Sequence, residues 1–296
     1  MKNLYLFLIL SAFFSSACLA EVSLEEKKAL MGLYNSTNGN HWVKKWDLNA
    51  PVSQWHGVKV IDDKVVEVNL FRNNLMGQLP VDIANLKYLT VLNLAFNSIT
   101  GELPKEISNL ARLRVLKLEM NRLKGEIPQE IGNLKQLEEL SAFNNFLSGS
   151  IPNSIGNIKT LRILNLSSNA LKGNIPDSLG ELTALETLGL FENTLEGAIP
   201  VEMGNLKNLK ELVLANNSLN GEIPREFEQL ASLEIFQIQN NDFNSFKNLE
   251  LLETRAFLVF DYDKNDRDIE FKDFDIDRKV RMADTKFEDS IEDIDK

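Results

Sequence analysis

The sequence predicts an α/β repeat solenoid, a curved superhelix of short stacked units with a parallel β-sheet on its concave face. Glycine and proline recur at one constant spacing, and each unit carries a short alternation of apolar and polar residues. Asparagine recurs every 24 residues in the same register, at Asn73, Asn97, Asn121, Asn145, Asn169, Asn193, Asn217 and Asn241. Because these columns hold over about 170 residues, they define a structural unit.

Residues 113–136 show what each half of the unit does. Leu116 and Leu118 alternate with polar residues, which is the pattern of a short strand with one buried face. Asn121 then turns the chain, and its side-chain amide can both donate to and accept from backbone groups. A stacked column of such amides can satisfy turn groups that have no strand partner.

The second half of the unit returns the chain to the next strand. Gly125 permits a backbone angle or a close approach that a Cβ would block. Pro128 fixes φ and removes a donor, which suits a segment outside a strand ladder. Ile131 and Leu134, three residues apart, predict the inward side of a short helical stretch. Each unit is too small to bury its own apolar face, so stability should come from stacking on neighbours.

The pattern LxxLxLxxNxLxGxIPxxIxxLxx over residues 65–241 resembles the plant-type extracellular leucine-rich repeat. That class includes receptor-kinase ectodomains and polygalacturonase-inhibiting proteins. The resemblance implies a curved, twisted leucine-rich-repeat superhelix with extra short strands near the Gly-x-Ile-Pro segments.

The segment before the repeats, residues 21–64, is similar to the N-terminal cap of this family. Ala29, Leu30 and Leu33 are expected on a helix, and Trp46 and the segment 55–58 (Trp-His-Gly-Val) resemble the W-x-G-V motif of that cap. Plant caps carry a pair of cysteines there, whereas this cap has none. The chain therefore resembles cysteine-free bacterial secreted versions of the fold.

The sequence divides into five parts. We expect a signal peptide over residues 1–20, the cap over 21–64, a solenoid of about 7.5 repeats over 65–242, a C-terminal cap over 243–260 and an acidic tail over 261–296. The C-terminal cap should close the open end of the stack with apolar side chains, namely Phe246, Leu249, Leu251 and Leu252.

The N-terminus has the pattern of an export signal. Lys2 precedes an apolar run that is too short to span a bilayer, and cleavage could follow Ala20. In an alternative interpretation Cys18 is the lipidated first residue of a membrane-anchored lipoprotein, since the residues before it resemble a loose lipobox. Both interpretations place the mature protein outside the cytoplasm, either secreted or at the cell surface. We expect no transmembrane span.

Charge and composition exclude several functions. The formal net charge is −11 and the pI is near 4.9, which argues against a nucleic-acid partner. Cys18 is the one cysteine, and His41 and His56 are the two histidines, both in the cap. We find no nucleophile–base pattern and no spacing typical of a metal site, and therefore expect neither an enzyme nor a cofactor.

Residues 261–272 open like a calcium-binding EF-hand loop. Asp261, Asp263 and Asn265 fit the first ligand positions. Asp266 stands where glycine is needed, and Lys272 stands where the bidentate glutamate is needed. The sequence thus favours a solvated acidic segment over a calcium site.

Apolar residues recur on the face that the strands should turn outward. At about 4.8 Å per strand they form a stripe of roughly 25 Å, made of Phe71, Phe96, Met120, Phe143 and Phe191. Charged residues border it, namely Glu67, Lys117, Glu119, Glu139, Glu192 and Glu211. An exposed apolar stripe rimmed by charge is typical of a recognition patch, so these five residues are the predicted ligand-binding site. Padding of neighbouring turns is the alternative.

Together these features favour an exported, non-catalytic binding protein that recognises a protein or a polysaccharide on its concave face. Inhibition of a secreted glycosidase or protease is one alternative. A structural or adhesive role in the cell envelope is another, because the fold alone does not determine the partner.

Overall fold

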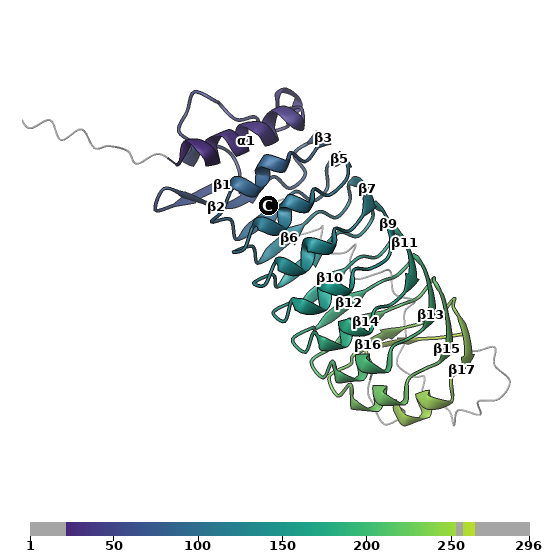
Figure 1. Ribbon diagram of the computed structural model, residues 1–296. Helices are drawn as coiled ribbons and strands as arrows, with labels where there is room; N and C mark the ends of the chain where they lie inside the picture. Colours follow the sequence, from purple (N-terminus) through teal and green to yellow (C-terminus); the bar gives the residue numbers. More distant parts are fainter. Residues whose placement is uncertain (1–21, 253–256, 264–296) are drawn as a thin grey trace, which may run out of the picture.

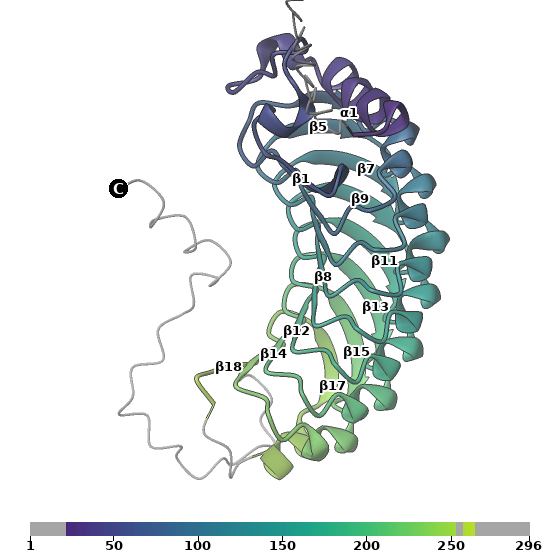
Figure 2. The same ribbon diagram turned by 90° about the vertical axis from the view of Figure 1, so that its left-hand side faces the viewer.

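The protein is a curved stack of repeats, seen from two directions in Figures 1 and 2. This computed structural model describes residues 22–252 and 257–263. One sheet lines the inner side of the arc, and short 3-10 stretches line its outer side (Figure 2). The predicted α/β leucine-rich-repeat solenoid is thus confirmed.

The inner, concave sheet has ten strands among the described residues. Its first strand pairs in antiparallel fashion and the others are parallel. Successive repeats add one strand each, so the sheet grows in chain order. The strands are β1 (Val58–Ile61), β2 (Lys64–Asn69), β4 (Val91–Asn93), β6 (Val115–Lys117), β8 (Glu139–Ser141), β10 (Ile163–Asn165), β12 (Thr187–Gly189), β14 (Glu211–Val213), β16 (Ile235–Gln237) and β18 (Val259–Asp261).

A second sheet of eight parallel strands runs beside the first among the described residues. It contains the glycines of the repeat, as the family resemblance implied. Its strands are β3 (Met76–Gln78), β5 (Ser98–Gly101), β7 (Arg122–Glu126), β9 (Phe146–Gly149), β11 (Ala170–Asn174), β13 (Thr194–Ala198), β15 (Ser218–Glu222) and β17 (Asp242–Ser245).

The outer side is built from 3-10 stretches that each follow a repeat proline. In residues 129–133 the turn closes when the Leu134 amide donates to the Ile131 carbonyl at 3.1 Å. Ile131 and Leu134 are fully buried. The equivalent stretches are Val81–Asn85, Lys105–Asn109, Gln129–Asn133, Asn153–Asn157, Asp177–Glu181, Val201–Asn205 and Arg225–Gln229.

The asparagine column ties each turn to its neighbours. The Asn145 side-chain amide donates to the carbonyls of Leu118 and Ala142 at 3.0 and 3.1 Å, and its oxygen accepts from the Leu123 amide at 3.0 Å. One side chain therefore satisfies backbone groups in two repeats that no strand partner reaches. The buried leucine columns stack beneath this ladder, so each repeat is stabilised mainly by its neighbours.

The N-terminal cap is held together by aromatic packing. Helix α1 (Leu24–Ser36) buries Ala29, Leu30 and Leu33, as its sequence predicts. The Glu26 carboxylate on this helix accepts the Val65 amide of β2 at 3.0 Å, which joins the helix to the first repeat. Ring centroids lie 4.7–5.9 Å apart in a cluster of four rings, Tyr34, Trp42, Trp46 and Trp55.

The C-terminal end is closed by Phe246, Leu249 and Leu252, which are all buried. Leu251, expected with them, is instead 41% exposed, because the 3-10 stretch Lys247–Leu252 turns it outward. Strand β18 then extends the concave sheet as far as Asp261. The predicted signal peptide, Cys18 and the acidic segment from residue 264 onward lie outside the described residues.

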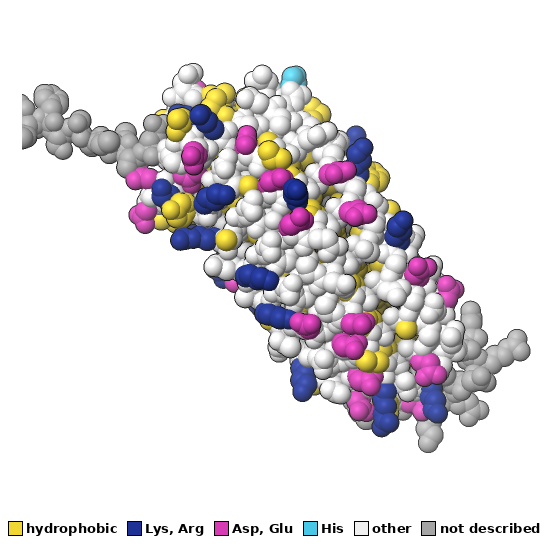
Figure 3. All heavy atoms as spheres, viewed as in Figure 1, with side chains coloured by type: hydrophobic (Ala, Val, Ile, Leu, Met, Phe, Trp, Pro, Cys, Tyr) yellow, Lys and Arg dark blue, Asp and Glu magenta, His cyan; other side chains and the backbone are white. Residues whose placement is uncertain are grey.

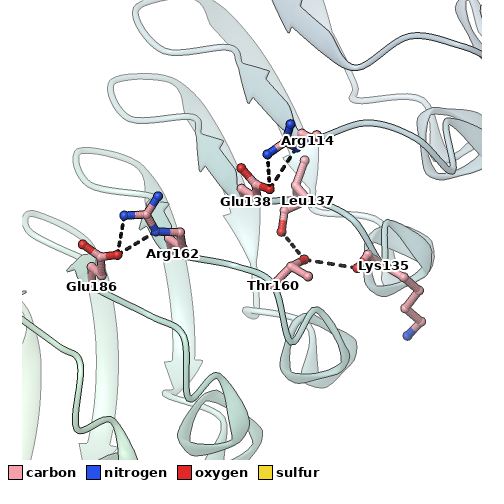
Figure 4. A network of polar contacts seen from close by, with 7 residues as sticks. All are labelled: Arg114, Lys135, Leu137, Glu138, Thr160, Arg162 and Glu186. Atoms are coloured by element: carbon pink, nitrogen blue, oxygen red, sulfur yellow. Dashed lines mark hydrogen bonds and ion pairs between the residues drawn. The ribbon is translucent and has the colours of Figure 1, made fainter.

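Residues of opposite charge pair between neighbouring repeats, at positions directly before the concave strands. Arg114 pairs with Glu138 at 2.6 Å (Figure 4). Lys210 pairs with Glu186 at 2.8 Å. Arg162 also binds Glu186, at 2.5 Å, so this carboxylate pairs with two basic side chains (Figure 4). These pairs are largely solvent-exposed, so each contributes at most about 1 kcal/mol. Elsewhere, acidic and basic side chains are interspersed over the face shown in Figure 3.

Candidate functional site

The concave sheet is hollowed where it meets the N-terminal cap. This N-terminal hollow has a volume of about 770 Å³ and is lined by residues of the cap and of β1, β2, β4 and β6 with their following turns. Its lining combines charges of both signs, amides and aromatic rings. The lining residues are Lys44, His56, Gly57, Val58, Lys59, Glu67, Asn69, Phe71, Asn93, Phe96, Lys117 and Glu119.

The cap wall of the hollow is fixed by hydrogen bonds to the first repeat. The Asn73 side chain accepts the Lys44 amide at 2.7 Å and donates to the Lys44 carbonyl at 3.2 Å. The Trp46 indole donates to the His56 carbonyl at 2.8 Å. Gly57, at φ +74°, packs so tightly that a Cβ would lie 1.9 Å from the Asn69 carbonyl oxygen. The asparagine ladder thus continues into the cap.

Two of the predicted ligand-binding residues meet in this hollow. The rings of Phe71 and Phe96 lie 5.2 Å apart at an angle of 58°, and Phe71 is 41% exposed. Phe71 directly follows the second core residue of its repeat, whereas Phe96 stands one position further on and has a left-handed backbone at φ 57°. Different backbone positions therefore bring the two rings together.

The other three predicted residues, Met120, Phe143 and Phe191, are half-buried and belong to the turns after β6, β8 and β12. Met120 also has a left-handed backbone, at φ 55°, and its sulfur accepts from the Asn144 side chain at 2.9 Å. Among the described residues, none of these three lines the hollow. Whether all five residues act together as a stripe stays a prediction.

Glu119 does not border the stripe as a solvated rim residue. It is only 7% exposed, and its Oε2 has no hydrogen-bond partner among the described residues. Desolvation raises the pKa of Glu119, and neighbouring Glu139 adds to this effect. Hydrogen bonds from its own backbone amide and from Ser141, with the attraction of Lys117, oppose the shift only in part.

Lys117 lines the hollow and is also paired with the neighbouring strand. Its ammonium lies 2.9 Å from a carboxylate oxygen of Glu139 on the neighbouring strand.

At the opposite end of the hollow, burial and the charge of Lys44 lower the pKa of His56. His56 is therefore a neutral lining residue at neutral pH, which leaves the two cap-side lysines as the positive groups there.

Among the described residues, no group of three or more His, Cys, Asp or Glu side chains could hold a metal ion. Within this part of the chain, no helix is long and apolar enough to cross a bilayer.

Sequence reasoning missed the contribution of the cap to this site. Lys44, His56 and Lys59 lie outside the repeat register, so no periodic pattern pointed to them. Asn69 and Asn93, in contrast, stand at equivalent outward strand positions 24 residues apart, and that column could have been found.

Comparison with family models identifies the repeats. A leucine-rich-repeat region matches residues 69–148, and single leucine-rich repeats match residues 160–182 and 208–230. The comparison with curated proteins gives no match.

Solved structures with the same fold come from plants and from a bacterium. The ectodomain of the Arabidopsis thaliana receptor kinase GASSHO1/SCHENGEN3, solved with CASPARIAN STRIP INTEGRITY FACTOR 2, is 31% identical with a TM-score of 0.74, covering 80% of this chain and 30% of that one. The Arabidopsis receptor kinase HAESA, solved with the peptide hormone IDA and a co-receptor, is 31% identical with a TM-score of 0.71, covering 81% and 41%. A leucine-rich-repeat protein of Leptospira interrogans is 36% identical with a TM-score of 0.56, covering 65% and 47%. The chain therefore spans less than half the length of each of these three proteins.

Proposed function

Since the chain is a leucine-rich-repeat protein of the plant-type extracellular class, we propose that it is an exported, non-catalytic binding protein whose concave face recognises a segment of another protein. The observation that carries this proposal is the N-terminal hollow, a concave site with convergent polar groups and an aromatic pair, exposed Phe71 and half-buried Phe96. Sites of this composition bind ligands by apolar contact and use a few polar groups for orientation.

A protein segment suits this hollow better than a polysaccharide does. The lining carries ammonium and carboxylate groups within one site, and peptides carry both charges whereas most glycans carry one or none. The HAESA structure holds the peptide hormone IDA, which supports the same choice. The predicted export signal and the extracellular class of the repeats support a secreted or surface location.

The proposal can be tested by finding out which face peptides use. Random short peptides displayed on phage would be enriched on the immobilised full chain. Enriched peptides should bind the Phe71→Ser variant at least about tenfold more weakly than wild type, because the exposed ring is the predicted anchor. Val201→Ser serves as the control, since Val201 is 51% exposed on an outer 3-10 stretch.

Equal binding to wild type and to Val201→Ser, with loss on Phe71→Ser, is the expected pattern. Absence of any enriched peptide would contradict the proposed function. If a folded Phe71→Ser protein binds the enriched peptides as tightly as wild type does, the binding face lies outside the hollow.

A further inference from the structure

Two lysines of the N-terminal hollow present ammonium groups to the solvent. Lys44 and Lys59 are exposed lining residues, and neither forms an ion pair with another described residue. The basic residues before the later concave strands, in contrast, pair with glutamates of neighbouring repeats. Both lysines of the hollow can therefore meet an anionic ligand, although the formal net charge of the chain is −11.

The lysines that line the hollow differ in their acidic neighbours. Lys117 lies 2.9 Å from a carboxylate oxygen of Glu139. Lys59 stands opposite Glu67 in the register of β1 and β2, so the Glu67 carboxylate offsets part of its charge. Lys44 has neither kind of acidic partner among the described residues, and its charge is therefore the least compensated of the three.

The other titratable lining residues do not oppose this charge. Glu119 is 7% exposed, and it is hydrogen-bonded by Ser141 and by its own backbone amide, so it faces the protein rather than a ligand. Burial and the charge of Lys44 lower the pKa of His56, so this ring is neutral at neutral pH. The cap end of the hollow is thus positive because of Lys44.

The backbone of Lys44 is held beside the turn that carries Phe71. The Lys44 amide donates to the Asn73 side chain at 2.7 Å, and the Lys44 carbonyl accepts from it at 3.2 Å. On the other side of this turn, the Asn69 amide donates to the Gly57 carbonyl at 2.7 Å. Phe71 lies between these two attachments and is 41% exposed. A weakly compensated ammonium and an apolar ring therefore adjoin on a fixed wall of the hollow.

We infer that the N-terminal hollow selects peptide segments in which an acidic side chain lies next to an apolar one. The carboxylate binds the Lys44 ammonium, and the apolar side chain packs on the Phe71 and Phe96 rings. The inference rests on the proposed function and deepens it by naming the ligand chemistry. Since the chain as a whole is acidic, it repels such a segment elsewhere, and the opposite charge of the hollow favours one docking position.

The geometry also limits the spacing within the ligand. Lys44 is attached at Asn73, two positions after Phe71 in the chain. An extended peptide advances about 3.3 Å per residue, and its alternate side chains face the same way. The acidic residue should therefore lie within about two positions of the apolar one.

The test uses displayed random peptides enriched on the immobilised full-length chain. Sequencing should show Asp or Glu close to an aromatic or aliphatic residue more often than in the unselected library. Synthetic peptides should lose affinity about threefold to tenfold when Asn or Gln replaces the acidic residue, an effect between those of exposed and buried ion pairs. Their C-termini are amidated, so the difference reports the acidic side chain and not a terminal carboxylate.

Lys44→Met tests whether this ammonium binds the ligand carboxylate. It should weaken binding of the acidic peptides about threefold to tenfold and leave binding of their Asn or Gln versions unchanged, because both changes remove the same contact. Unchanged binding of the neutral versions also shows that the variant is folded.

Two further variants serve as controls for this result. Lys45 is exposed beside Lys44 in the chain but does not line the hollow, so Lys45→Met should leave binding of both peptides unchanged. Lys59→Met should have a smaller effect than Lys44→Met, since Glu67 already offsets part of the Lys59 charge.

The outcomes distinguish the inference from the function beneath it. Enriched peptides that show no acidic preference, yet are lost on Phe71→Ser, would overturn the inference and leave the proposed function standing. Equal losses on Lys44→Met and Lys45→Met would also overturn it, as would an equal loss of acidic and neutral peptides on Lys44→Met. If no peptide is enriched at all, the proposed function itself fails.

Discussion

The two halves of the concave side are built from the same repeat, but they differ at the residue before the ladder asparagine. Every repeat places this residue in the left-handed region, at φ 50–58°. In the later repeats, four of the five occupants are asparagine or serine, and asparagine tolerates this conformation because its side chain can bond locally. The first repeats hold Arg72, Phe96 and Met120 there instead.

The buried carboxylate of Glu119 lies in the same early repeats as Phe96 and Met120. Sequences depart from local preference mainly where a function requires it, and the departure is offset elsewhere in the fold. The backbone around the hollow should therefore be more strained than the backbone of the later repeats, where asparagine and serine suit the left-handed position.

The largest difference in stability should lie between substitutions at two glycines with nearly the same backbone angle φ. Gly57 has φ +74° and a Cβ there would meet the Asn69 carbonyl oxygen, whereas Gly173 has φ +76° and nothing within 4 Å. Gly57→Ala should cost about 3 kcal/mol or more, because backbone must move. Gly173→Ala should cost about 1 kcal/mol, the left-handed penalty alone. Urea unfolding checks both values, and equal costs would show that the cap wall is not rigid.

The next effect concerns the ladder that both halves share. Asn145→Ala removes the donors to Leu118 and Ala142 and the acceptor for Leu123, which should cost about 1–3 kcal/mol. The exposed Lys172→Ala should change the free energy of unfolding by about 0.5 kcal/mol or less. Thermal unfolding compares the two, and a similar shift for both would argue against a structural ladder.

Exchanging residues between the halves tests the comparison itself. Met120→Asn should raise the free energy of unfolding by about 1 kcal/mol, since asparagine relieves the left-handed strain. Asn216→Met should lower it by about the same amount. Chemical denaturation measures both variants, and the account is wrong if both changes destabilise equally.

The smallest effect is a pH dependence from Glu119. Its pKa is raised in the folded state above the usual 4.5, so the folded protein binds the proton more tightly than the unfolded chain. This contribution to stability is complete below pH 4.5 and is lost as the pH rises through the raised pKa. Glu119→Gln should therefore be more stable than wild type at neutral pH, with the difference disappearing in acid. The free energy of unfolding of both proteins, measured across pH, checks this. A difference between them that stays constant with pH would contradict it.

The fold was predictable because each repeat position has one physical task that its sequence column repeats. Asn121, Gly125 and Pro128 each appear in every full unit, so the register, the strands and the turns followed from spacing alone. The 3-10 form of the outer stretches was not distinguished from a helical turn, because both bury residues three apart.

The site was predictable only in part. Phe71 and Phe96 were chosen for their place on the outward side of the strands, and they do line the hollow. Glu119 was expected as a charged residue at the border of the stripe, but it is buried, because its exposure depends on how neighbouring repeats pack over it. Lys44 and His56 come from the cap, where no repeated column marks a function.

The most direct test of the account is hydrogen–deuterium exchange of the full chain with and without an enriched peptide. Protection should rise in residues 58–119, where the hollow and its strained neighbours lie. Residues 163–237, which form the later concave strands, should exchange as in the free protein. Protection confined to the later strands would contradict the claim that the N-terminal half is the binding half.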